Sequence, residues 1–182
     1  MKKEWMVSGI VVCLLVVLIG AGWLVRDRFL PVEVGTVAPS FPATDLVGEP
    51  VTLEDLRGEV VLLNIWATWC APCREEMPSM QRLHERFGDR LRIVAVSVDA
   101  PFGRIDPGGN QGGNVEAFAQ EMGLTFDIWM DPSGEIQRLY RTTGVPETFI
   151  IGRDGVIVRK HLGPAEWDSP ANIDQFERLL EG

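Results

Sequence analysis

The feature that most constrains the fold is a pair of cysteines placed between a buried strand and an amphipathic helix. Residues 60–66, VVLLNIW, form a continuous apolar run, which predicts a strand buried on both faces. Cys70 is expected at the end of this strand, and Cys73 in the first turn of the following helix. A second apolar run, LRIVAVSV at residues 91–98, completes a parallel strand–helix–strand unit.

This position predicts nucleophilic chemistry for the two thiols. Free N–H groups and the positive end of the helix dipole stabilise an anion at a helix start, which lowers the pKa of a thiol there. We therefore expect thiol–disulfide exchange in which Cys70 attacks and Cys73, one helical turn away, resolves the mixed disulfide. Half of a metal site and two inert core cysteines are the other interpretations, although the chain offers no second ligand pair.

The rest of the pattern predicts one α/β domain over residues 35–182. Asn114 is a plausible helix N-cap, and Ser169 and Pro170 are typical of the start of a last helix. Residues 148–162 read as two strands joined by an Asp-Gly turn. We expect a central mixed sheet with helices on both faces. The chain carries a net charge of −9 and no evident basic face, which argues against nucleic-acid binding.

The N-terminal segment differs from the domain. Residues 7–25 contain no charged side chain, and their length suits a helix that crosses a bilayer. We expect a cytoplasmic head at 1–6, a transmembrane signal anchor at 7–25 and a linker at 26–34. A cleaved signal peptide is the competing interpretation. Basic residues on the two sides are nearly balanced, so charge alone does not fix the orientation.

Two motifs, VVLLNIWATWCAPCREEMPSM and GVPETFII, resemble the thioredoxin superfamily. The lead-in VGTVAPSFPATDLVGEPVTLEDLRG is typical of its membrane-anchored branch, the TlpA/ResA/CcmG-like thiol-disulfide oxidoreductases. The resemblance covers about residues 35–180. It implies a thioredoxin-like fold with an N-terminal β-hairpin and an insert near residues 100–124.

The resemblance also implies how clients bind. It places a cis Val145–Pro146 peptide against the cysteine pair, with Val145 offering its backbone to a bound peptide strand. Trp69 is expected to be partly exposed as a surface for clients, whereas Trp66 belongs to the core beneath the site.

The implied function is that of an extracytoplasmic thiol-disulfide oxidoreductase that reduces disulfides of client proteins. Apocytochrome c and copper-site cysteines are the usual clients of such proteins, and the sequence does not choose between them. A membrane electron donor of the transmembrane thiol-reductase type would supply electrons. We expect a monomer, anchored at the outer or periplasmic face of the cell membrane, with no cofactor and no metal. A copper-binding chaperone and a thiol peroxidase of the peroxiredoxin group are the alternatives.

One group is missing from the expected chemistry. Cys73 must lose a proton before it resolves the mixed disulfide, and many thioredoxins place a buried aspartate six residues before the first cysteine. Asn64 occupies that position here and does not titrate near pH 7. Another acid should therefore tune the pair. The candidates are Glu147, which directly follows Pro146, and Asp99 at the end of the second strand; an alternative is that Glu147 only faces solvent.

Overall fold

The structure is a computed structural model that describes residues 14–20 and 32–181. Its contacts divide the chain into two compact units, Met1–Pro31 and Val32–Gly182. Residues 14–20 of the first unit are helical. Within the two described ranges, no helix combines the length and the apolar character that a membrane span requires.

The segments expected at the N-terminus lie largely outside these ranges. The head at 1–6 is not described, and only short parts of the expected anchor at 7–25 and linker at 26–34 are. These boundaries stay predictions.

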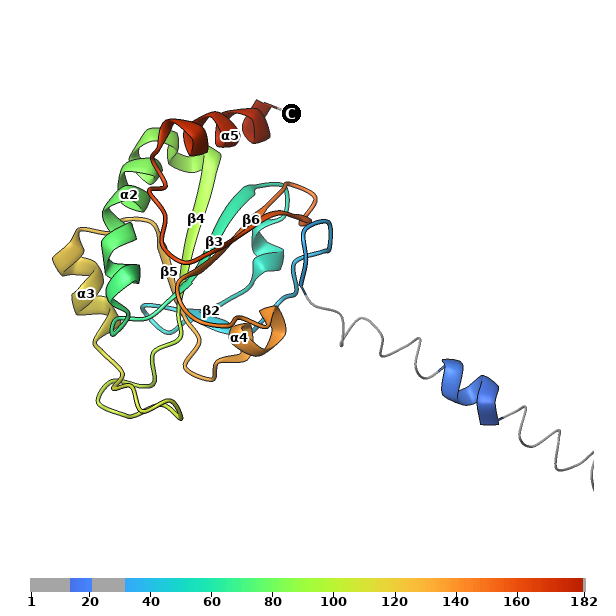
Figure 1. Cartoon of the computed structure of the whole chain (residues 1–182). Coiled ribbons are helices and arrows are strands. Elements are labelled where there is room, and N and C mark those ends of the chain that lie inside the picture. The colour runs from blue at the N-terminus through green and yellow to red at the C-terminus, as the bar shows by residue number, and fades with distance from the viewer. Residues whose placement is uncertain (1–13, 21–31, 182) are drawn as a thin grey trace, which may run out of the picture. The chain divides into compact units, whose positions relative to one another are not determined.

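A seven-stranded mixed sheet forms the centre of the domain (Figure 1). In spatial order the strands are β2 (Pro50–Val51), β1 (Ala43–Asp45), β5 (Asp127–Met130), β4 (Leu91–Ser97), β3 (Val60–Trp66), β6 (Glu147–Ile151) and β7 (Ile157–Leu162). β3, β4 and β5 are parallel, and the other neighbouring pairs are antiparallel. The expected N-terminal hairpin is β1–β2, and the hairpin expected within residues 148–162 is β6–β7.

Four α-helices accompany the sheet: α2 (Ala71–Phe87), α3 (Val115–Met122), α4 (Glu135–Tyr140) and α5 (Pro170–Glu181). Two short 3₁₀ helices, η2 (Leu53–Leu56) and η3 (Gly88–Arg90), complete the elements. The predicted cap of α3 is confirmed, because the Asn114 side chain accepts a hydrogen bond from the Ala117 N–H at 2.9 Å. The last helix begins at Pro170 as expected.

Helices pack against both faces of the sheet, and alternate side chains of the strands contact them. Trp66 of β3 packs against Phe118 of α3 with ring centroids 4.9 Å apart. Phe149 of β6 pairs with Leu63 of β3. Leu63 is three residues from Trp66 on the same strand, so the side chains of Leu63 and Phe149 point to the opposite face of the sheet from Trp66. On that second face Phe149 packs against Tyr140 of α4 at 4.8 Å. The expected sheet with helices on both faces is thus confirmed.

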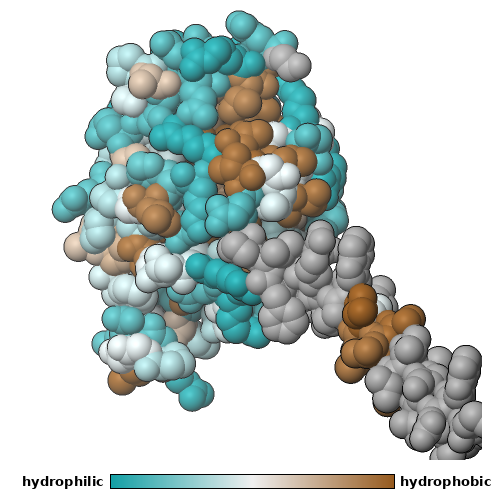
Figure 2. Space-filling model, turned by 45° about the vertical axis from the view of Figure 1, so that its right-hand side comes forward, coloured by the Kyte–Doolittle hydropathy of each residue, from teal (hydrophilic) through white to brown (hydrophobic). Residues whose placement is uncertain are grey.

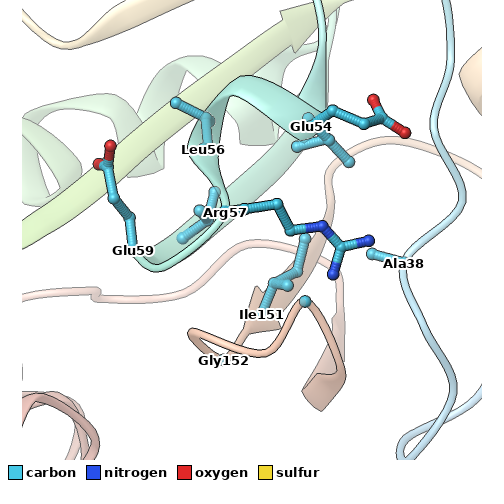
Figure 3. A pocket seen from close by; sticks show the side chains of 10 residues that line it. Ala38, Glu54, Leu56, Arg57, Glu59, Ile151 and Gly152 are labelled. Atoms are coloured by element: carbon cyan, nitrogen blue, oxygen red, sulfur yellow. The ribbon is translucent and has the colours of Figure 1, made fainter.

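A small pocket lies where β3 begins, at the end of the strand that is remote from the cysteines. Its lining includes Ala38, Leu56, Val61 and Ile151 (Figure 3). The Arg57 side chain extends into it and donates a hydrogen bond to the carbonyl of Asp154 at 2.7 Å, which ties η2 to the β6–β7 turn. This arrangement explains the pocket as part of the packing around η2.

Candidate active site

The two cysteines form a disulfide across the start of α2, with an S–S distance of 2.01 Å. Cys70 is the N-cap residue, and the backbone N–H of Cys73 donates to its sulfur at 3.2 Å. The expectation that Cys70 ends β3 is wrong. The strand ends at Trp66, because its pairing with β4 stops at Ser97, and a turn precedes the helix.

The helix start favours a thiolate at Cys70 over one at Cys73. An anion on the Cys70 sulfur would receive the Cys73 N–H and the positive end of the α2 dipole. Cys73 is completely buried, whereas Cys70 retains 4% exposure. Of the two cysteines, Cys70 is therefore the one that keeps some exposed surface.

The loop before β6 approaches the same sulfur. The Val145–Pro146 peptide is cis, as expected, and the Val145 carbonyl oxygen lies 3.5 Å from the Cys70 Sγ. Pro146 is buried, and Val145 is partly exposed. The structure thus brings Val145 and Pro146 to the cysteine pair.

The two tryptophans near the motif differ in solvent exposure, as expected. Trp66 is completely buried under the site, and Trp69 in the turn before α2 is 39% exposed. Trp69 therefore borders the cysteines with a large apolar surface that is open to solvent.

The structure places Glu147 in the interior. Only 1% of this residue is exposed, so the alternative in which it merely faces solvent does not hold. Its carboxylate forms an ion pair with Lys160 of β7 at 2.9 Å and accepts a hydrogen bond from the Thr143 N–H at 3.3 Å. Its role in tuning the cysteines stays a prediction.

Asp99 holds together the backbone around the site. One carboxylate oxygen accepts hydrogen bonds from the Thr68 N–H and the Ser97 hydroxyl, both at 2.8 Å. The other accepts from the Thr68 hydroxyl at 2.5 Å and the Gly113 N–H at 3.1 Å. Asp99 therefore fixes the turn between β3 and α2; whether it also tunes the cysteines stays a prediction.

A third acid, Glu76, did not emerge from the sequence. It lies on α2 three residues after Cys73, so the two side chains occupy neighbouring positions of one helix face, with Cβ atoms roughly 5–6 Å apart. It is 2% exposed. Its carboxylate accepts hydrogen bonds from the Asn64 amide at 2.8 Å, the Trp167 indole at 3.0 Å and the Ala165 N–H at 3.1 Å.

Burial raises the pKa of Glu76 above that of an ordinary glutamate, against the opposing effect of its hydrogen-bond donors. A buried acid with a raised pKa is suited to exchange a proton with a neighbouring group close to neutral pH. Asn64, noted from the sequence as the residue in place of an acid, contacts this carboxylate directly. The sequence did contain a signal: Glu76 interrupts the stripe of buried residues formed by Cys73, Met77 and Met80.

Within residues 14–20 and 32–181, no group of three or more His, Cys, Asp or Glu side chains could hold a metal ion.

Comparison with known proteins places this site in a family. The model of the AhpC/TSA family matches residues 34–160. The chain is 40% identical over 168 residues to the thioredoxin-like protein YneN of Bacillus subtilis (strain 168), covering 90% of this chain and 92% of that protein. It is 36% identical to the thiol-disulfide oxidoreductase ResA of Geobacillus kaustophilus (strain HTA426), covering 86% of this chain and 87% of ResA.

The fold agrees with these sequence matches. A protein from Chlorobium tepidum, assigned as a thiol:disulfide interchange protein DsbE, superimposes with a TM-score of 0.68 at 31% identity. The match covers 83% of this chain and 99% of that structure.

Proposed function

The chain belongs to the AhpC/TSA family, and from this premise we propose that it reduces disulfides of client proteins through Cys70 and Cys73. Its activity class is that of a thiol-disulfide oxidoreductase, as its relatives are named. The observation that carries the proposal is the Cys70–Cys73 disulfide across the start of α2, with the Cys73 N–H on the Cys70 sulfur.

The proposed reaction begins with both cysteines reduced. The Cys70 thiolate attacks one sulfur of the client disulfide, the client S–S bond breaks, and the departing client sulfur takes up a proton. The Cys73 thiol then loses its proton and attacks the Cys70 sulfur. The mixed disulfide breaks, the second client thiol leaves, and the Cys70–Cys73 disulfide remains. The client gains two electrons, and the protein loses two.

Glu76 is our candidate for the group that takes the proton from Cys73. It lies one turn along the same face of α2 and is anchored by three donors that leave little freedom to its carboxylate. The raised pKa of Glu76 brings its affinity for a proton closer to that of a thiol. Glu147 and Asp99, the acids proposed from the sequence, would act on the cysteines through their negative charge.

Client binding is proposed at the loop before β6. The Val145 backbone lies beside Cys70 and is partly exposed, so it can pair with an extended segment of the client that brings a sulfur to the nucleophile. Trp69 supplies an apolar surface on the same side of the cysteines.

The proposed setting is outside the cytoplasm. The apolar run at residues 7–25 is proposed as a membrane anchor, with the domain on the outer or periplasmic face. A membrane thiol reductase would return electrons to the Cys70–Cys73 disulfide. Apocytochrome c and copper-site proteins, with cysteines that must be reduced before they bind their cofactors, are the proposed clients.

The division of labour between the sulfurs can be tested by trapping. Reduced Cys73→Ser should accumulate mixed disulfides with a model client such as insulin, because Cys70 attacks and nothing resolves the product. Cys70→Ser should not, because the remaining Cys73 is completely buried. Non-reducing electrophoresis followed by mass spectrometry measures both adducts. Equal trapping by the two variants would contradict the assignment.

A further inference from the structure

The segment between β4 and α3 folds as a small hairpin beside the cysteines. In Figure 1 it is the yellow-green loop that projects beyond the starts of α2 and α3. Backbone hydrogen bonds join Asp106 N–H to the Asn110 carbonyl at 2.9 Å and Gly112 N–H to the Arg104 carbonyl at 2.8 Å. The Asp106 carboxylate also accepts from the Asn110 backbone and side chain, which fixes the turn. We call residues 103–112 the hairpin loop.

Hydrogen bonds connect the base of the hairpin loop to the turn that precedes the cysteines. Asp99 accepts hydrogen bonds from Thr68 in that turn and from Gly113 at the base of the loop. The contact is so close that a Cβ on Gly113 would lie 2.2 Å from the Thr68 hydroxyl oxygen. The loop therefore has a defined position relative to Cys70, and a partner that binds it does not first have to order it.

The hairpin loop and Trp69 border a groove with exposed apolar side chains. The groove extends from Trp69, which directly precedes Cys70 in the chain, between the loop and the start of α4. Its lining also includes Thr142, Pro101, Ile105 and Pro132. Ile105 is 69% exposed and Trp69 39%. Figure 2 shows one small hydrophobic patch at the lower tip of the domain, among hydrophilic and neutral side chains. Exposed apolar side chains that line a groove together are typical of an interaction site.

One arginine of the groove can pair with an anionic side chain of a partner. Among the residues that the structure describes, Arg104 forms no ion pair, whereas Arg138 is paired with Glu135. The carboxylate of Asp106 carries the opposite charge, but Asn110 donates a hydrogen bond to each of its two oxygens and so orients it into the turn of the loop. Arg104 is exposed to solvent, although the protein as a whole carries a net charge of −9.

Building on the proposed function, we propose that this groove binds the client. The occupant is an extended segment of the client protein that carries an aliphatic or aromatic side chain and a carboxylate close to its disulfide. The apolar side chain would contact Trp69 and Ile105, and the carboxylate would pair with Arg104. The reacting disulfide would then lie at the Cys70 end of the groove.

The test uses two synthetic peptides with the same intrachain disulfide and the same leucine, flanked by two glutamates in one and two lysines in the other. The rate constant for oxidation of the fully reduced protein by each peptide is measured by acid quenching and chromatography. We expect the glutamate peptide to react about two- to five-fold faster at low salt, the range for one or two exposed ion pairs. High salt should reduce the preference.

Arg104→Glu should abolish or invert this preference. Arg90→Glu is the matched control, because Arg90 is an exposed arginine at the end of η3 and its substitution changes the net charge equally; this variant should keep the preference. Each peptide is also made with glycine in place of leucine. Ile105→Ser should reduce the rate advantage that the leucine peptides have over their glycine versions. Val47→Ser, at a residue that is 83% exposed on the β1–β2 turn, should not.

The possible failures are distinguishable. If the reduced wild-type protein exchanges with neither peptide, the proposed function itself fails. If it reacts with both peptides at the same rate, or if Arg104→Glu and Arg90→Glu alter the preference equally, the exchange chemistry stands and the docking groove is refuted.

Discussion

Replacement of Asp99 by asparagine tests the strongest structural statement about the turn between β3 and α2. Asparagine has nearly the same shape, so the substitution alters hydrogen bonding and charge without leaving a cavity. Each carboxylate oxygen accepts one backbone N–H, from Thr68 on one oxygen and from Gly113 on the other. Whichever way the new amide turns, its NH₂ group faces one of these donors. The hydroxyl of Thr68 or Ser97 can reverse its role, but the backbone N–H cannot.

The expected loss of stability follows from the hydrogen bonds that the substitution removes or weakens. One backbone N–H, of Thr68 or of Gly113, loses its acceptor on the side chain of Asp99, which is 2% exposed, and the remaining hydrogen bonds lose their charge assistance. Hydrogen bonds to charged groups contribute about 1.5–3 kcal/mol each, and an unsatisfied buried donor costs about 1–3 kcal/mol. We expect Asp99→Asn to lower the free energy of unfolding by about 3 kcal/mol, which corresponds to a fall in Tm of about 6–12 °C for a domain of this size.

The assay is urea unfolding of the oxidised protein, so that the cysteines do not titrate. Asp174→Asn is the matched control, because Asp174 lies on the exposed face of α5 and should change stability by no more than about 0.5 kcal/mol. If Asp99→Asn unfolds within about 0.5 kcal/mol of the wild type, the described hydrogen bonds do not support the turn, and the reasoning fails.

Two further predictions concern the other buried acids. Burial raises the pKa of Glu76 in the folded state, so the native protein binds this proton more tightly than the unfolded chain, and stability contributed by the protonated group is lost as pH rises through the raised pKa. Urea unfolding at several pH values should therefore show the oxidised wild type losing stability relative to Glu76→Gln, by at most about 1.4 kcal/mol per pH unit; a difference that does not vary with pH would show that Glu76 keeps an ordinary pKa. Glu147→Gln removes a negative charge and leaves Lys160 unpaired, so it should lower the pKa of the Cys70 thiol and slow release of the mixed disulfide. Alkylation of reduced protein across pH measures the first effect, and an unchanged profile would exclude Glu147 as a tuning acid.

The fold could be predicted because its signals are local. The apolar run at 60–66, the cysteine spacing and the turn at Asp154 each specify an element without reference to distant residues. The end of β3 is not a local feature: Cys70 lies one short turn beyond the strand, because the pairing of β3 with β4 ends at Ser97. Strand ends depend on such partners, which the sequence of one strand does not contain.

The acids of the site were harder to predict, because burial depends on tertiary contacts. Glu76 interrupts a stripe of apolar residues on α2, but the helix sequence does not contain the partners that bury its carboxylate, Trp167 and Ala165, which lie about ninety residues later in the chain. Glu147 could be placed near the cysteines from its position after Pro146, but its partner Lys160 lies on the next strand. The hairpin loop lies in the region recognised as an insert, yet only the structure revealed that it is fastened to Thr68 through Asp99.

The midpoint potential of the Cys70–Cys73 couple tests the central claim most directly. The protein is equilibrated with dithiothreitol redox buffers of defined ratio, and the fraction of free thiols is measured after acid quenching and alkylation. A reductant of client disulfides requires a low potential, and we expect a value close to that of reducing thioredoxins, about −270 mV. A value near about −120 mV, as for a strong oxidant of the DsbA kind, would show that the couple donates disulfides and would contradict the account.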